Sequence, residues 1–292
     1  MPEIKVLESP SKMKQFDTCQ LLGQLTYIDR WEPREAHISL IPRLRGNAFA
    51  KACDVIHKAI RDQAQIDDPV FIDQVVNESV SLFNRQYEYC VTAGISFKPD
   101  VDALIRTELR RVVPLYVKQT PFRQHWRITD VEFPIKTHGC RPDLAGLDPT
   151  GFHFVGDMKY KASLEARYEH DTIEEFHWDY QFQQYNAAYR SHRQLSSSDP
   201  VYSYLFLVVG SPFRIRPVGW VYTPEQMALW QASAEDLTQM IRQITQEGKL
   251  PRAATTHRSR FGWCPMKKAC LEYYLDPHLM ADDYVQLKEL PE

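Results

Sequence analysis

The chain has 292 residues, of which 43% are hydrophobic and 25% are charged, and its formal net charge is −3. These values are typical of a globular protein with a sizeable core, and they exclude a disordered chain or a collagen-like repeat. The charge lacks the strongly basic balance common among nucleic-acid-binding proteins, so any nucleic-acid site must be a local basic patch. The length suits one large domain or two small ones.

The sequence carries no sign of secretion or membrane insertion. The opening residues, MPEIKVLESPSK, lack the apolar segment of a secretory signal. The most apolar stretch, residues 201–210, is too short to span a bilayer. We therefore expect a cytoplasmic protein, in which paired cysteines indicate metal binding before a disulfide.

The hydrophobic pattern alternates between helical and strand-like segments. Apolar residues at helical spacing predict helices over residues 9–30, 43–115, 171–194 and 224–248. Short β-rich segments predict strands over residues 126–135, 151–160, 202–209 and 218–223. The turn-forming sequence LDPTG joins the first two of these strands, which we expect to be antiparallel. The third is continuously apolar, as is typical of a strand covered on both faces.

This order of elements predicts one α/β domain over residues 1–292. Within it we expect a mainly helical N-terminal arm at residues 1–115 and a core at residues 125–225. Helices in residues 224–292 are expected to pack back on the N-terminus.

Charged residues gather where a buried strand is expected to end. Asp157 and Lys159 are two positions apart, so they point to the same face of an extended strand. Asp143 precedes the turn and is expected to converge with Asp157 at one end of the hairpin. Two carboxylates with the backbone carbonyl of Met158 suit a hard cation such as Mg²⁺ or Mn²⁺.

Such a site predicts metal-assisted hydrolysis of a phosphodiester. The cation would acidify a bound water, and Lys159 would orient that water or neutralise charge on the phosphate. Glu132 is a further candidate ligand, for the same cation or a second one, or an outward residue on an edge strand. The alternative for the whole group is a surface hairpin that carries solvated charges.

The motifs in their order resemble a known family. "RPDLAG" followed by "VGDMKYK" resembles the P-D…(D/E)-x-K signature of the PD-(D/E)XK nuclease superfamily. "QFQQYNAAY" is similar to the Q-x-x-x-Y motif of its RecB-like exonuclease branch, carried here by Gln181 and Tyr185. The resemblance implies a restriction-endonuclease-like core, a central mixed sheet flanked by helices. It also implies that Gln181 and Tyr185 lie beside the metal and contact the nucleic-acid backbone.

Both ends of the chain resemble iron–sulfur members of that branch, with one departure. Cys19 stands in the N-terminal place, and Cys264 and Cys270 keep a C-terminal spacing of that pattern. The fourth cysteine is replaced by Phe261, and the nearest substitute is His257. A [4Fe–4S] cluster usually needs four thiolates, so these three cysteines hold a cluster with a substitute ligand or are buried apolar residues where the termini pack together.

A second departure concerns a histidine that RecB-like enzymes often use as a metal ligand, in the pattern G-x-x-x-H. Here Gly46 is followed at that spacing by Ala50. Asp54 and His57 share the helical stripe of Ala50, so either is a candidate to replace the missing ligand, or both lie on a solvated helix face.

These features predict a metal-dependent deoxyribonuclease, a RecB-like exonuclease of phage or bacterial DNA processing, recombination or defence. DNA is the expected substrate, and a helicase or recombination protein is a possible partner. The alternative is a catalytically silent relative that binds nucleic acid or a partner nuclease as a structural subunit. Candidate backbone contacts are basic residues in separate clusters, namely Arg43, Arg45, Arg106, Arg110, Arg111, Lys159, Lys161 and Arg190.

Overall fold

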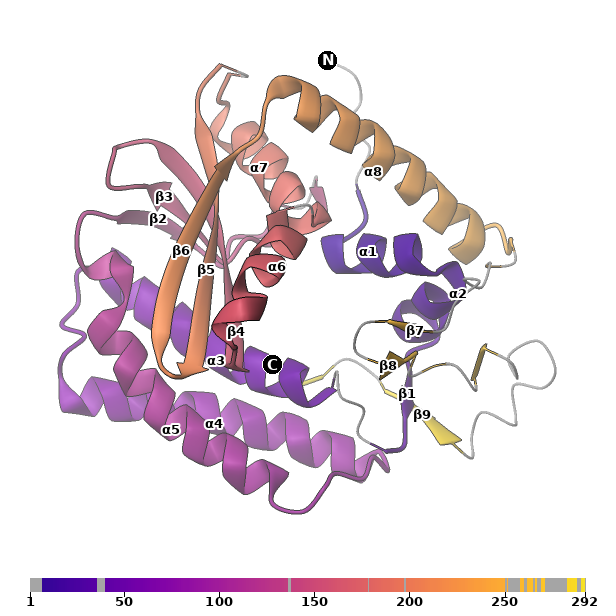
Figure 1. Ribbon diagram of the computed structural model, residues 1–292, viewed down its shortest axis with the longest axis horizontal. Coiled ribbons are helices and arrows are strands. Elements are labelled where there is room, and N and C mark those ends of the chain that lie inside the picture. Colours follow the sequence, from indigo (N-terminus) through magenta and orange to yellow (C-terminus); the bar gives the residue numbers. More distant parts are fainter. Residues whose placement is uncertain are drawn as a thin grey trace.

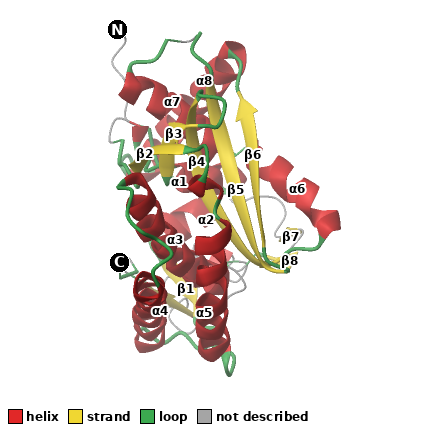
Figure 2. Ribbon diagram, turned by 90° about the vertical axis from the view of Figure 1, so that its left-hand side faces the viewer, coloured by secondary structure: helices red, strands yellow, loops and turns green. Residues whose placement is uncertain are grey.

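The centre of the molecule is a five-stranded mixed sheet (Figures 1 and 2). The computed structural model describes residues 7–35, 40–135, 138–177, 179–196, 198–249, 251, 258–259, 262–264, 266, 269–270, 283–287 and 290–291. In spatial order the strands are β2 (Arg127–Val131), β3 (Leu144–Leu147), β4 (His153–Ser163), β5 (Val201–Ser211) and β6 (Arg214–Val221). Neighbouring strands are antiparallel except β4 and β5, which are parallel.

Helices precede, interrupt and follow the strands. They are α1 (Pro10–Thr18), α2 (Gln20–Gly23), a π-helical turn (Gln24–Ile28), α3 (Leu40–Arg61), α4 (Pro69–Thr92), α5 (Val101–Gln119), a 3₁₀ turn (Pro121–Arg123), α6 (Ala166–His177), α7 (Tyr180–Arg193) and α8 (Pro224–Thr245). Short strands form two further pairs, β1 (Trp31–Pro33) with β9 (Tyr284–Gln286), and β7 (Arg258–Ser259) with β8 (Gly262–Trp263). Within the described residues, no helix combines the length and hydropathy needed to cross a bilayer.

Both faces of the sheet are covered by helices. Phe206 and Val208 of β5 belong to the main core with residues of α3, α4 and α5, which lie together in Figure 1. Leu205 and Leu207 point the other way and pack with Phe182 of α7. Because successive side chains of a strand face opposite sides, an unbroken apolar run is needed to fill both layers. The predicted α/β fold, with a mixed sheet between helices, is confirmed.

The predicted hairpin is wrong in one respect. The turn at residues 147–151 joins β4 to β3, and the segment at 126–135 supplies β2, one strand further out. The four residues of β3 are too few to show an alternating pattern. Gly146 is required there, because a Cβ atom on it would lie 1.9 Å from the carbonyl oxygen of Arg127 in β2.

The N-terminal helix α1 packs against both α7 and α8 (Figure 1). Met13 and Phe16 are buried with Trp230 and Ile241 of α8. The side chain of Gln184 in α7 donates a hydrogen bond of 2.9 Å to the backbone carbonyl of Glu8, just before α1. The division of the chain into an arm, a core and C-terminal helices within one domain stays a prediction.

A histidine is buried between α3 and α5. Nε2 of His57 lies 2.7 Å from the hydroxyl oxygen of Tyr116, and its ring packs edge-on against Phe122. Burial lowers the pKa of His57 from 6.5 to about 3. The ring is therefore neutral in the folded protein over the range in which an unfolded histidine becomes protonated.

We expect His57 to make the protein less stable in acid. Its pKa is lower in the folded state, so the unfolded state binds more protons between pH 6.5 and about 3. The free energy of unfolding should fall by about 1.4 kcal/mol for each pH unit over that window from this group. Urea unfolding at several acidic pH values measures the free energy of unfolding. This free energy should fall less steeply with decreasing pH for His57→Gln than for wild type. His170→Gln, the same change at an exposed histidine, should keep the wild-type dependence of stability on pH. The same dependence in His57→Gln would contradict a buried, neutral His57.

Candidate active site

The site lies where β4 extends beyond its neighbour β3. Leu144 is the first residue of β3 and pairs with Gly156, so residues after Gly156 have no β3 partner. The backbone N–H of Met158 instead donates a hydrogen bond of 2.7 Å to Oδ2 of Asp143. In an extended strand the carbonyl of a residue points to the same edge as its N–H. The Met158 carbonyl therefore also faces the space beside Asp143.

Asp157 and Lys159 share the opposite side of β4 from Met158. Asp157 is 1% exposed, whereas the Lys159 side chain is 29% exposed. Nζ of Lys159 lies 2.7 Å from Oδ2 of Asp157 and above the ring of Phe176 in α6, 5.8 Å from its centroid. The ammonium thus compensates the buried carboxylate and remains accessible at the surface.

Helix α7 supplies a second contact to the buried carboxylate. Nε2 of Gln181 donates to Oδ1 of Asp157 at 2.6 Å and to the hydroxyl of Tyr185 at 2.7 Å. Gln181 and Tyr185 are four residues apart and so lie on one face of the helix. The structure thus brings Gln181, Tyr185, Asp157 and Lys159 into one connected group.

The pKa values of both aspartate carboxyls are raised. Burial raises the pKa of Asp143 well above its usual range, and nearby Asp157 and Glu132 raise it further. Burial also raises the pKa of Asp157, although Lys159 partly offsets this effect. Burial alone would lower the pKa of Lys159, but the two aspartates outweigh it and the pKa is raised. The site thus holds more negative charge than its one ammonium neutralises.

Glu132 lies next to the aspartates but forms an ion pair with Arg141. It follows β2, where its N–H donates to the Asp143 carbonyl at 2.8 Å, and its carboxylate lies 2.8 Å from Nε of Arg141. Burial raises the pKa of Glu132, and Arg141 opposes that shift. Glu132 and Arg141 line a groove of about 510 Å³ between α3 and the sheet, together with Ala50.

Asp54 and His57 are the candidates to replace the histidine of the G-x-x-x-H pattern, and they lie in two different places. Asp54 lines the same groove as Ala50 and Glu132 and is paired with Lys58 at 2.8 Å. His57, one turn further, is buried, and its ring packs against Tyr116 and Phe122. Asp54 therefore shares a groove with Glu132, whereas His57 is part of the core.

The geometry suits one hard cation held by few protein ligands. Oδ2 of Asp157 is buried and has no well-aligned hydrogen bond among the described residues, which leaves acceptor capacity there. Among all the residues that the structure describes, no group of three or more His, Cys, Asp and Glu side chains is placed to hold a metal. Mg²⁺ is usually bound by one or two carboxylates and keeps several waters. Asp143, Asp157 and the Met158 carbonyl fit that pattern.

Three predicted cysteine ligands come together near the N-terminal helices. Cys19, Cys264 and Cys270 pack at one apolar cluster with Leu21 and Met266. Burial raises the pKa of Cys264, and burial together with the neighbouring cysteines raises the pKa of Cys270 to about 11. These three are reduced in the structure.

The fourth position of the iron–sulfur pattern cannot be placed in this cluster. Phe261 and His257 lie outside the described residues. The described side chains supply three thiols where a [4Fe–4S] cluster usually takes four thiolates. They do not complete that set, so no step of the chemistry is assigned to a cluster.

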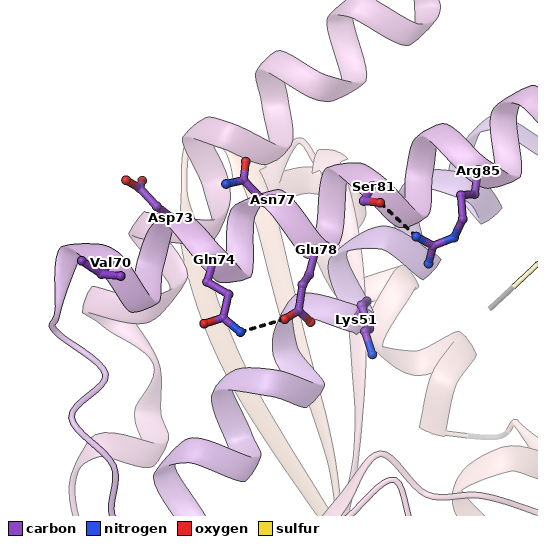
Figure 3. A pocket seen from close by; sticks show the side chains of 8 residues that line it. All are labelled: Lys51, Val70, Asp73, Gln74, Asn77, Glu78, Ser81 and Arg85. Atoms are coloured by element: carbon purple, nitrogen blue, oxygen red, sulfur yellow. Dashed lines mark hydrogen bonds between the residues drawn. The ribbon is translucent and has the colours of Figure 1, made fainter.

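A second hollow lies elsewhere, on helices α3 and α4. A depression of about 710 Å³ is formed by Lys51 of α3 and polar residues of α4 (Figure 3). Gln74 donates to Glu78 at 3.0 Å, and Arg85 donates to Ser81 at 2.9 Å. None of the predicted catalytic or metal residues lines it.

Several basic residues predicted to contact DNA already have protein partners. Arg43 pairs with Glu32 at 2.7 Å, and Arg45 pairs with Glu108 at 3.2 Å. Arg111 donates to the carbonyl of Gly210. Arg45 thus links α3 to α5, while Arg43 joins α3 to β1 and Arg111 joins α5 to β5. Lys159 beside Asp157 and Arg141 beside Glu132 are also paired, but their side chains remain 29% and 59% exposed.

Sequence reasoning missed two residues that support the site. Phe176 underlies the Lys159 ammonium, and Asp179 caps α7 by accepting a hydrogen bond of 3.0 Å from the backbone N–H of Gln181. An aspartate just before a helix is a recognisable capping signal. The position of Phe176 carries no such signal, because it depends on how α6 folds over β4.

We expect Asp143→Asn to stabilise the metal-free protein and to abolish its response to metal. The raised pKa of Asp143 means that the folded state holds this proton more tightly, so stability is lost as pH rises above the unfolded value. A neutral Asn removes that penalty at pH 8. Wild type should gain about 2.7 kcal/mol at a Mn²⁺ concentration 100 times Kd, measured as a thermal shift.

The control for this variant is Asp73→Asn, which alters an exposed acid of α4 that is not among the candidate metal ligands. It should keep the Mn²⁺-dependent shift. A full shift in Asp143→Asn would show that the cation binds elsewhere.

Comparisons with known proteins identify a family for this chain and a structure of similar fold. The family model described as the PD-(D/E)XK nuclease superfamily matches residues 8–271. A crystal structure of a "putative exonuclease" from Eubacterium rectale is similar in fold, with a TM-score of 0.50 and 12% identity over 90% of this chain and 88% of that one. No curated protein matches the sequence. The chain belongs to the PD-(D/E)XK nuclease superfamily.

Proposed function

We propose that this protein is a metal-dependent deoxyribonuclease, an exonuclease of RecB-like type that uses Mg²⁺ or Mn²⁺. The observation that carries the proposal is the cluster at the end of β4. There Asp143 accepts from the Met158 N–H, and Asp157 lies 2.7 Å from the Lys159 ammonium. The name of the similar Eubacterium rectale protein supports exonuclease over other nuclease activities.

The residues would divide the work of hydrolysis between them. Asp143, Asp157 and the Met158 carbonyl would hold the cation, which when bound acidifies a water and neutralises phosphate charge. Lys159 would place its ammonium against the phosphate or the attacking water, where negative charge increases as the phosphorus–oxygen bond breaks. Its contact with Phe176 limits the directions in which the side chain can point.

Gln181 and Tyr185 would support the metal ligand. Gln181 fixes one oxygen of Asp157, which leaves the other directed at the ammonium and the cation. Burial and the two aspartates raise the pKa of Tyr185, so its hydroxyl stays protonated and remains a hydrogen-bond donor at neutral pH. That donor is available to a phosphate oxygen of the substrate.

The groove beside Glu132 is the proposed path of the DNA backbone. Lys51, Lys58 and Arg141 line it, together with Glu132. Its lining, within the described residues, includes no aromatic side chain on which a base could stack. Binding there should depend on phosphate contacts and therefore on salt, without preference for base sequence.

One observation favours the second candidate, a silent nuclease-fold protein that binds nucleic acid or a partner nuclease. Ala50 lines the groove where the RecB-like pattern has a ligating histidine, and the nearby Glu132 is paired with Arg141. Against this candidate, a chain freed from catalysis has no need to keep two like charges buried together, since their burial is costly.

Substitution of the two central residues separates these candidates. Wild type should degrade linear DNA in Mg²⁺ or Mn²⁺. Asp157→Ala should be inactive, and Lys159→Met should lose about 100- to 1,000-fold in kcat, the usual cost of removing a group that stabilises developing charge. Release of acid-soluble nucleotides from single- and double-stranded substrates measures the activity.

A wild type that leaves both substrates intact, yet still binds DNA in a gel-shift assay, would favour the silent candidate.

Arg141→Gln tests the groove in the same assay. It should weaken DNA binding and reduce the slope of log affinity against log salt concentration by about one, the value for one phosphate contact.

A further inference from the structure

The turn between α6 and α7 is organised around one nearly buried carboxylate. The Asp179 side chain is 6% exposed, and its Oδ1 accepts a hydrogen bond of 3.0 Å from the N–H of Gln181. The backbone N–H of Asp179 donates to the carbonyl of Phe176 at 3.1 Å. A charge in this position needs a partner, because an unpaired buried carboxylate is costly.

The partner comes from the far N-terminal helix. Nζ of Lys14 in α1 lies 2.6 Å from Oδ2 of Asp179, and 3.8 Å from a carboxylate oxygen of Glu175. The Lys14 side chain is 45% exposed, whereas Asp179 is buried. The Lys14 ammonium thus pairs with Oδ2 of Asp179, the carboxylate oxygen that does not cap α7.

Two contacts lead from this turn to the candidate active site. Gln181, whose N–H is capped by Asp179, holds Oδ1 of Asp157 at 2.6 Å. Phe176, whose carbonyl binds the Asp179 N–H, lies beneath the Lys159 ammonium. The position of this turn therefore bears on both members of the Asp157–Lys159 pair.

We propose that Lys14 is a remote positioning residue for the catalytic centre, acting through Asp179 to hold the α6–α7 turn that carries Phe176 and Gln181. The inference rests on the proposed nuclease function for its kinetic consequences. Helix α1 is suited to this role because α7 and α8 fix it on two sides. Lys14 takes no part in the chemistry itself.

Lys12 provides a matched control on the same helix. It forms an ion pair with Glu8 at 3.1 Å, one turn away. Lys12→Met removes the same charge from α1 as Lys14→Met. Any general effect of charge on stability or DNA attraction should appear in both variants.

The experiment compares wild type, Lys14→Met, Lys14→Arg and Lys12→Met. Without DNA or metal, Lys14→Met should speed hydrogen exchange of the Gln181 backbone amide, measured by NMR. With linear DNA and Mn²⁺, its kcat should fall about 10-fold, the lower end for groups that support a metal ligand, while KM is unchanged. Lys14→Arg should restore both values, and Lys12→Met should match wild type.

A double-mutant cycle tests the path. Asp179→Asn keeps a side chain that caps helices well but loses the ion pair. Lys14→Met should then add little to the effect of Asp179→Asn, because both remove the same interaction. Full additivity of the two substitutions would overturn the proposal.

Other outcomes also decide the matter. Unchanged Gln181 exchange in Lys14→Met would overturn the proposal, as would a raised KM with a smaller salt dependence of DNA binding, which would make Lys14 a phosphate contact. If wild type degrades no DNA, the proposed function fails. The exchange rates then decide alone, and faster exchange in Lys14→Met than in Lys12→Met supports the positioning role.

Discussion

The hydrogen bond from the Met158 backbone to Asp143 depends on a mismatch in strand length. Strand β3 begins opposite Gly156, while β4 continues alongside β5 to Ser163. A backbone N–H at a sheet edge needs an acceptor, and the carboxylate of Asp143 meets that need just before β3 begins. The same bond brings the two aspartates of the motif together.

This arrangement concentrates negative charge at a cost in stability. Burial raises the pKa of both aspartates, Asp157 raises that of Asp143 further, and one ammonium offsets only part of the charge. A cation bound between the aspartates, as we propose, would offset this cost. The contacts made by Gln181 and Phe176 oppose the tendency of the charges to separate.

The surrounding layers make this local geometry depend on distant segments. The sheet is fixed by apolar cores on both faces, so β4 cannot shift without disturbing them. On one side α7 carries Gln181 and Tyr185, and α1 contacts the first turn of that helix through Lys14. The N-terminal helix, remote in sequence, is thus linked to Asp157 by three successive contacts, Lys14 with Asp179, Asp179 with Gln181, and Gln181 with Asp157.

The sequence was sufficient where a pattern was long or a motif was fixed. The apolar run of β5 and the capped helix α8 were predicted because each repeats one period over many residues. Strand β3 was missed because four residues carry no period, and its place depends on Gly146 against β2. His57 shares a helical stripe with Ala50, but two turns of helix carry it into the core beside Tyr116. Tertiary packing decided both cases.

The central claim is that one divalent cation binds between Asp143 and Asp157 at the open edge of β4. Anomalous X-ray diffraction from crystals soaked in Mn²⁺ tests it most directly. We expect a peak within coordination distance of both aspartates and the Met158 carbonyl. A peak at another site alone, or none at saturating Mn²⁺, would contradict the account.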